Sequence, residues 1–334
     1  PLQHLIRTAD LRPEGVRHVL GLAADLRRDP RLGAGDLAGR KVVFHQSRPA
    51  TRVRRTFSAA AERLGAELLA AAAGDGQHGR HGDDRGGRAD RMSAGDDVAA
   101  VVVAHGDHDG IRRLADGAVH PVVNARSDRH HPCQGLADLL TLHDAFGCRG
   151  TWRVAHVGEA DATATSLLEA GALAGLDLVV ATPEGCGPPP ETIEAVRRIG
   201  RRTGARLRLT HDPVAAVVGA DAVHAGPWFR LGLDDEARAQ RRSALRPCGA
   251  VADLVELAAP HAVLLQAAPV HPDDELPPGR ARRVRSLARE QAVNLTAVAA
   301  AVLLALHRGD LPTDVPIAPE VAHRDLVTAR VALP

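Results

Sequence analysis

An imidazole and a carboxamide lie three residues apart in the segment His131-Pro132-Cys133-Gln134, just before an amphipathic stretch. At the start of a helix, side chains at positions i and i+3 share a face, so His131 and Gln134 can contact one small polar ligand. A histidine can donate to a developing oxyanion, and a glutamine can accept from an amide N–H. The structural alternative is a His–Pro turn followed by polar residues that cap a helix.

The composition narrows the classes of function. The chain has 334 residues, of which 45% are apolar, enough for one large or two medium domains with a substantial core. The 42 basic and 41 acidic residues give a net charge of +1, which argues against a nucleic-acid partner, because such proteins need a basic excess. Aromatic residues make up 2% of the chain, with no Tyr, which argues against base stacking on single strands.

The cysteine spacing and the hydropathy pattern indicate the cellular compartment. The four cysteines, Cys133, Cys148, Cys186 and Cys248, form no Cys-x-x-Cys pair, as is typical of free thiols in a reducing cytoplasm. No apolar run reaches the roughly 18–20 residues that span a bilayer, and the first residues lack the pattern of a secretion signal. We therefore expect a cytoplasmic protein with no membrane partner.

Periodicity and turn residues predict two series of alternating strands and helices. In the first series, strands are expected at 41–44, 98–104 and 121–124, and helices at 11–26, 51–72 and 111–115. In the second, strands are expected at 153–157, 176–181, 206–209, 222–225 and 262–266, and helices at 163–173, 190–203 and 214–218. Residues 73–96, rich in Gly, His, Asp and Arg, are predicted to form a mobile loop.

Two such series predict an α/β fold of two doubly wound parallel-sheet domains linked by helices. We expect an N-terminal domain at 1–148, completed by a helix at 284–308, and a second domain at 149–283. Residues 309–334 are expected to form an extended tail.

The sequence supports neither a nucleotide-cofactor site nor a metal site. The turn that begins at Gly158 lacks the second and third glycines of a dinucleotide-binding fingerprint, and no Walker phosphate loop occurs. The His- and Asp-containing run at 104–109 follows a predicted strand, but it has no set ligand geometry and is expected to be a polar loop rather than a metal site. We therefore expect no cofactor and no metal.

The segment His131 to Gln134, with the Leu-Ala-Asp-Leu-x-Thr pattern behind it, resembles the His-Pro-Cys-Gln segment of the carbamoyltransferases, in particular the ornithine carbamoyltransferases. In that family the His and Gln hold the carbamoyl group of carbamoyl phosphate. Further similarity at 42–44, 51–53, 166–171, 210–213 and 219–221, and at Trp228 and Gly232, extends the resemblance over about residues 1–308. These are mostly scaffold positions. The resemblance implies a homotrimer that takes small-molecule substrates, carbamoyl phosphate or an analogue together with an amino acid.

The phosphate-binding segment departs from the family pattern. The family uses Ser-Thr-Arg-Thr-Arg at a helix N-terminus, and the resemblance aligns this motif with residues 48–52. Ala50 then stands in the place of the catalytic arginine, and Pro49 has no N–H to donate. A second family arginine corresponds to Ala104. The candidate phosphate-binding residues are Arg48, Thr51, Arg52 and His105.

The acceptor side also departs from the pattern. Gly226 replaces an acid that would pair with an amine, and Arg230 replaces a serine and hints at an anionic acceptor group. Thr165 stands where the family has an asparagine for the substrate carboxylate. The family's His-Cys-Leu-Pro turn corresponds to residues 266–269. The candidate acceptor-binding residues are Thr165, Arg230, Leu231, Gln266 and Ala267.

Two classes of function remain open. The first is a diverged transferase of amino-acid or specialised metabolism with a changed acceptor or donor, for which His131 and Gln134 are the catalytic candidates. The second is a catalytically inactive paralogue, a pseudoenzyme that serves as a binding or assembly protein. Loss of one charge donor to a transition state costs about 10²–10³ in rate, so ordinary ornithine carbamoylation is expected to be slow unless another cation compensates.

Overall fold

The computed structural model describes residues 2–47, 50–71, 95–147, 151–228, 234–248, 251–266 and 284–312. These residues fall into two compact units. Unit 1 comprises Pro1–Ala137, Asp161–Leu167 and Val293–Thr313, and unit 2 comprises Asp138–Ala160 and Leu168–Ala292. The predicted loop at 73–96 lies outside the described residues except at its last two positions, and the predicted tail lies outside them beyond residue 312.

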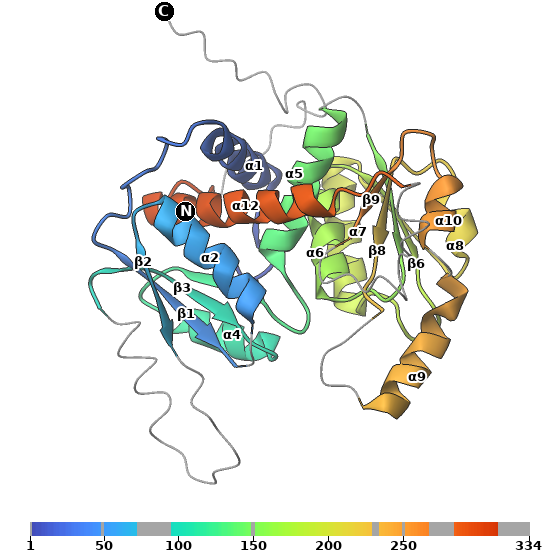
Figure 1. Ribbon diagram of the computed structural model, residues 1–334, viewed down its shortest axis with the longest axis horizontal. Helices are drawn as coiled ribbons and strands as arrows, with labels where there is room; N and C mark the ends of the chain where they lie inside the picture. The colour runs from blue at the N-terminus through green and yellow to red at the C-terminus, as the bar shows by residue number, and fades with distance from the viewer. Residues whose placement is uncertain are drawn as a thin grey trace, which may run out of the picture. The chain divides into compact units, whose positions relative to one another are not determined.

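Unit 1 is built on a four-stranded parallel sheet in the order β2-β1-β3-β4 (Figure 1). The strands are β1 (Lys41–Gln46), β2 (Glu67–Ala71), β3 (Val98–Ala104) and β4 (Val122–Arg126). The central strand β3 is a run of Val and Ala that is buried at every position, as expected where helices cover both faces of a parallel sheet. Its helices include α1 (Pro13–Arg28), α2 (Thr51–Arg63) and α4 (His108–Asp116).

Unit 2 is built on a five-stranded parallel sheet in the order β7-β6-β5-β8-β9 (Figure 1). The strands are β5 (Arg153–Val157), β6 (Asp177–Ala181), β7 (Arg206–Thr210), β8 (Ala222–Ala225) and β9 (Val263–Leu265). Its helices include α7 (Pro190–Thr203), α8 (Pro213–Val217), α9 (Asp235–Leu245) and α10 (Val251–Glu256). In both sheets the strand order reverses next to the first strand of the series, so the predicted α/β fold with two parallel sheets is confirmed.

Three helices are divided between the units: α5 (Pro132–Phe146), α6 (Ala162–Leu173) and α12 (Ala288–Arg308). The boundary within α5 comes before the expected one at residue 148, because the second half of this helix packs in unit 2. There the rings of His143 and Trp152 meet edge to face with centroids 4.9 Å apart.

The predicted helix at 51–72 is wrong in its second half. Helix α2 ends at Arg63, and Gly65 adopts a left-handed φ of 82°, which only glycine takes up without strain. The chain then turns into strand β2, which pairs in parallel with β1. Helices α9 and α10 were not predicted at all.

Helix α12 is the one described helix that bears on the question of membrane spans. With 21 residues and a mean hydropathy of 1.3 in its most apolar window, it has the length and composition to cross a bilayer. However, 67% of that window is buried inside the protein, which is the pattern of a core helix.

Candidate active site

The carboxyl ends of the parallel strands in unit 1 meet at one edge of the sheet, which is where ligands bind in open α/β sheets. The order of the strands reverses between β1 and β3, so the carboxyl ends of these two strands are the expected site. Gln46 ends β1 opposite Ala104 at the end of β3, and Ala104 in turn pairs with Arg126 at the end of β4.

Helix α2 begins next to this edge, and the backbone N–H groups of its first turn are available to bind a ligand. Its N-cap residue, Ala50, has no side chain that can cap the helix, and the first turn has no acidic residue. Thr51 and Arg52 form the first two positions of the helix and are both exposed. A cation at a helix N-terminus opposes the helix dipole unless an anion lies beside it, so this arrangement fits an anion site. Arg48 lies outside the described residues.

His131 directly precedes α5 and Gln134 lies in its first turn, so the predicted helix start is present at this segment. Pro132 is the first helical residue, and the carbonyl of His131 accepts from the N–H of Gln134 at 2.9 Å. The N–H of His131 donates to Ser166 Oγ at 2.8 Å. Both side chains are buried, each with 6% of its surface exposed.

The imidazole of His131 is neutral at physiological pH. Burial, together with the smaller effect of the charge of Arg126, lowers its pKa to about 3. Its Nδ1 is buried and has no hydrogen-bond partner among the described residues. Because buried polar atoms nearly always have a hydrogen-bond partner, we expect a ligand atom to bond this nitrogen.

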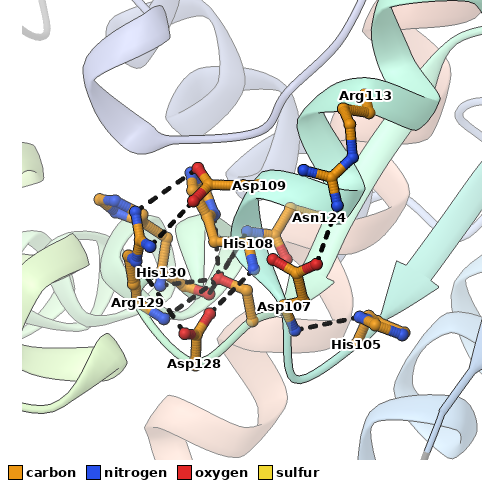
Figure 2. Close-up of polar contacts among 10 residues, drawn as sticks. His105, Asp107, His108, Asp109, Arg113, Asn124, Asp128, Arg129 and His130 are labelled. Carbon is orange, nitrogen blue, oxygen red and sulfur yellow. Dashed lines mark hydrogen bonds and ion pairs between the residues drawn. The ribbon is translucent and has the colours of Figure 1, made fainter.

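A polar cluster holds the loop that precedes His131 (Figure 2). Ser127 lies at its centre and receives the N–H of His130 at 2.9 Å and the side-chain amide of Asn124 at 3.4 Å. The rings of His130 and His108 pack together with centroids 4.5 Å apart. Burial lowers the pKa of both histidines, that of His130 to about 2.

The same cluster ties the loop to helix α4 (Figure 2). Asp128 Oδ1 accepts from the N–H of His108 at 2.9 Å, and Arg129 pairs with Asp109 at 2.9 Å. The loop after β4 is therefore fixed to the helix after β3, which holds the backbone that carries His131.

His105 lies at the end of β3, near the predicted phosphate site but with one ring nitrogen already used. Its N–H donates to the carbonyl of Arg126 at 3.0 Å, and its Nδ1 accepts from the N–H of Asp107 at 3.0 Å. Among the described residues, no group of three or more His, Cys, Asp or Glu is placed to hold a metal ion. This includes the run at 104–109.

In unit 2 the strand order reverses between β5 and β8, and two glycines lie at their carboxyl ends. Gly158 has a φ of 115° and lies so close to Gly226 that a Cβ on Gly158 would be 3.3 Å from the Cα of Gly226. A Cβ on Gly226 would lie 2.6 Å from the carbonyl oxygen of Glu159. The position at which the resemblance implies an acid therefore has no room for a side chain.

The nearby carboxylate of Glu159 is paired with a cation. The guanidinium of Arg241, on α9, forms an ion pair with it and also donates to the carbonyls of Pro227 and Trp228 at 2.6 and 2.8 Å. Both charged side chains are largely buried, with 13% and 17% of their surface exposed. This carboxylate is not available as a free acid for a ligand amine.

Two buried histidines flank the same switch point. His156 on β5 and His224 on β8 pair in register, and their Nδ1 atoms lie 2.9 Å apart. His156 Nε2 lies 3.1 Å from the carbonyl of Glu159, and His224 Nε2 lies 3.8 Å from Asp138 Oδ2. Burial holds the pKa of His224 well below its usual value.

The remaining acceptor candidates divide between described and undescribed residues. Thr165 is buried in the first turn of α6 in unit 1, with 1% of its surface exposed. Gln266 follows β9, and its N–H donates to Gln291 Oε1 at 2.8 Å. Arg230, Leu231 and Ala267 lie outside the described residues.

Sequence reasoning missed two features of these edges. Arg126 reads in the sequence as the polar end of an apolar strand, and its pairing with Ala104 depends on the register of the sheet. The histidine pair was missed because each histidine sits alone in its strand. The recurrence of a histidine near the end of two neighbouring strands was the available signal.

Comparison with known proteins agrees with this geometry. Residues 3–144 match the carbamoyl-phosphate-binding domain of the aspartate/ornithine carbamoyltransferase family, and residues 151–306 match its aspartate- or ornithine-binding domain. The ornithine carbamoyltransferase of Acidothermus cellulolyticus is 38% identical over 90% of this chain and 96% of its own length. That of Parafrankia sp. is 34% identical over 87% and 92%.

Solved structures give the same result. The ornithine carbamoyltransferase of Pyrococcus furiosus superposes with a TM-score of 0.84 at 32% identity, covering 93% of this chain and 98% of its own. That of Thermus thermophilus superposes with a TM-score of 0.77 at 30% identity, covering 92% and 99%.

Proposed function

Because this chain belongs to the aspartate/ornithine carbamoyltransferase family, we propose that it transfers the carbamoyl group of carbamoyl phosphate to an amine. In this reaction the amine nitrogen attacks the carbamoyl carbon and loses a proton. The bond from that carbon to the phosphate oxygen breaks, and its electron pair leaves with the phosphate. The observation that carries the proposal is the neutral, buried imidazole of His131 with its unpartnered Nδ1.

His131 suits the stabilisation of the carbamoyl oxygen. Negative charge develops on that oxygen as the amine adds, and a fixed N–H in a water-poor site stabilises such charge strongly. Because the pKa of His131 is about 3, the ring stays uncharged over the whole physiological range, so its role does not depend on protonation. Gln134, three residues later in the first turn of α5, supplies the amide that would fix the carbamoyl NH₂.

The N-terminus of α2 supplies the matching site for the phosphate. The structure starts this helix at Thr51, so Arg52 is a first-turn cation and is a stronger candidate for phosphate binding than the sequence alignment suggests. The free N–H groups of the first turn and the helix dipole act in the same direction.

The acceptor is proposed to differ from ornithine at the group that an acid would bind. Gly226 leaves no room for a carboxylate, and Arg241 neutralises Glu159. An amine with a free ammonium at that position would therefore find no counter-ion from these two residues. We propose an acceptor that is uncharged or anionic there.

The test combines carbamoyl phosphate with a panel of amines and detects the carbamoylated product by mass spectrometry. The panel pairs each diamino acid with the same compound acylated on its α-amine. Because carbamoyl phosphate slowly releases cyanate, which carbamoylates amines without an enzyme, His131→Gln serves as the reference. We expect its rate to fall about 10²–10³-fold, while His18→Gln, on the exposed face of α1, keeps the full rate. Equal rates for His131→Gln and the unaltered protein would refute the proposal.

The closed position at Gly226 also favours a second candidate, a catalytically inactive binding or assembly protein. That function predicts saturable binding of carbamoyl phosphate with no product from any amine of the panel. In either case the family resemblance supports a homotrimer, which sedimentation would detect as three times the 35.1 kDa mass of the chain.

A further inference from the structure

Arg126 is an unpaired cation at the carboxyl edge of the sheet in unit 1. It is the last residue of β4, and its side chain is exposed. Among the described residues its guanidinium has no ion-pair or hydrogen-bond partner. By contrast, Arg129, three residues later, is occupied by Asp109. An arginine without a partner beside a ligand-binding edge is available to bind an anion.

The register of the sheet places Arg126 next to the position where a cation is missing. Ala104, which stands where the resemblance implies the second family arginine, pairs directly with Arg126. The N–H of His105 donates to the carbonyl of Arg126 at 3.0 Å, which fixes the two strand ends together.

An irregularity in the sheet produces this pairing. Val103 pairs with Asn124, but the next residue, Ala104, pairs with Arg126, so Ala125 is left over on β4. Such a bulge changes the direction of the following side chain, and bulges are frequent next to active sites. Here it makes Arg126, rather than Ala125, the residue on β4 that pairs with Ala104.

Arg126 also lies within electrostatic reach of the catalytic candidate. Its charge is the second cause, after burial, of the lowered pKa of His131. The cation is therefore close enough to act on a ligand that contacts His131.

From this placement we infer that Arg126 binds the phosphate of carbamoyl phosphate and supplies, from the neighbouring strand, the charge that Ala104 lacks. This inference rests on the proposed function, because it assigns a residue to the same donor site. The planar guanidinium can contact two phosphate oxygens at once, and the charge on those oxygens grows as the carbon–oxygen bond breaks.

The experiment measures binding of carbamoyl phosphate, orthophosphate and pyrophosphate by calorimetry to the full chain and to three variants. Arg126→Leu removes the charge, and Arg126→Lys keeps it without the planar fork. Arg112→Leu is the matched control, an exposed arginine on the adjacent helix α4. We expect Arg126→Leu to bind carbamoyl phosphate about 10- to 100-fold more weakly, Arg126→Lys to fall between, and Arg112→Leu to be unchanged.

A relocation variant adds a second readout. Ala104→Arg combined with Arg126→Leu returns the cation to β3, and we expect it to recover at least part of the lost affinity. Because Ala104 is buried, circular dichroism first checks that this variant is folded, and Arg126→Leu alone carries the test if it is not.

The outcomes separate this inference from the proposed function. If carbamoyl phosphate binds and Arg126→Leu changes its affinity less than twofold, the inference is overturned while the function stands. If carbamoyl phosphate does not bind but orthophosphate or pyrophosphate does, and Arg126→Leu abolishes that binding, the anion site stands without the function. If none of the three anions binds the unaltered chain, both are overturned.

Discussion

His130 offers a direct measurement of the electrostatics around the candidate site. Its ring has 3% of its surface exposed and packs on His108, and burial lowers its pKa to about 2. In the unfolded chain the pKa of a histidine returns to about 6.5. Between these values the unfolded chain binds a proton that the folded protein does not. The contribution of this group to stability is therefore complete above pH 6.5 and declines as the pH falls below it.

The size of the effect follows from linkage. Each pH unit within this window costs about 1.4 kcal/mol of stability per histidine. Because the unfolded histidine binds its proton mostly below pH 6.5, lowering the pH from 7 to 5 costs about 1.9 kcal/mol for His130 alone. The variant His130→Phe keeps a ring of similar shape against His108 and leaves the backbone bonds to Ser127 in place. The free energy of unfolding of both proteins falls between pH 7 and pH 5. We expect the fall to be about 1.9 kcal/mol smaller for His130→Phe than for the unaltered protein.

The assay is denaturant unfolding at pH 7 and pH 5, followed by a signal from unit 1. The control is Phe57→Leu, which loosens the core of the same unit without changing a titratable group, so it should lower stability equally at both pH values. If His130→Phe shows the same loss between pH 7 and pH 5 as the unaltered protein, the argument that burial holds this histidine neutral is refuted.

Two further predictions concern unit 2. Gly226→Ala forces a methyl group to within 2.6 Å of the Glu159 carbonyl, so we expect a loss of about 1–3 kcal/mol by thermal denaturation, whereas Gly187→Ala, with its nearest neighbour at 3.6 Å, should cost much less. Equal melting temperatures for the two variants would contradict the crowding at Gly226. Arg241→Met leaves the carboxylate of Glu159 without its counter-ion and should cost about 3 kcal/mol in urea unfolding. Adding Glu159→Gln should recover part of that loss, and no recovery would show that the ion pair is not its cause.

The sequence was sufficient to predict the architecture because the signals are local. Buried strands such as Val98–Ala104 are continuous apolar runs, and Pro190 and Gly204 mark the two ends of α7. The failure at 51–72 has a physical cause. Its Ala-rich second half suits a helix or a buried strand equally well, and the turn at Gly65 and pairing with β1 decide between them.

The candidate site was predictable only where one segment carries the chemistry. His131 directly precedes α5 and Gln134 lies in its first turn, so their placement follows from their spacing at a helix start. Arg126 depends on a bulge in the pairing of β3 with β4, which no local pattern reveals. Likewise, the sequence shows that Gly226 lacks an acid, but only the packing against Glu159 shows that no acid fits there.

With both rings neutral, the paired histidines of unit 2 have only one consistent arrangement of protons. A carbonyl can only accept, so His156 Nε2 must carry the proton that it shares with Glu159. Its Nδ1 is then bare, and the short contact between the rings requires His224 to be the donor there. His224 Nε2 is bare in turn and faces a carboxylate oxygen of Asp138, and two acceptors explain why these atoms stand 3.8 Å apart.

The other oxygen of that carboxylate accepts from Gln291 Nε2 at 2.6 Å, and Gln291 Oε1 faces the N–H of Gln266. The orientation of the Gln291 amide and the tautomers of both rings are thus set by two backbone groups at opposite ends of one chain of contacts. A proton added to Nδ1 of His156 would set two N–H donors against each other at the contact between the two rings.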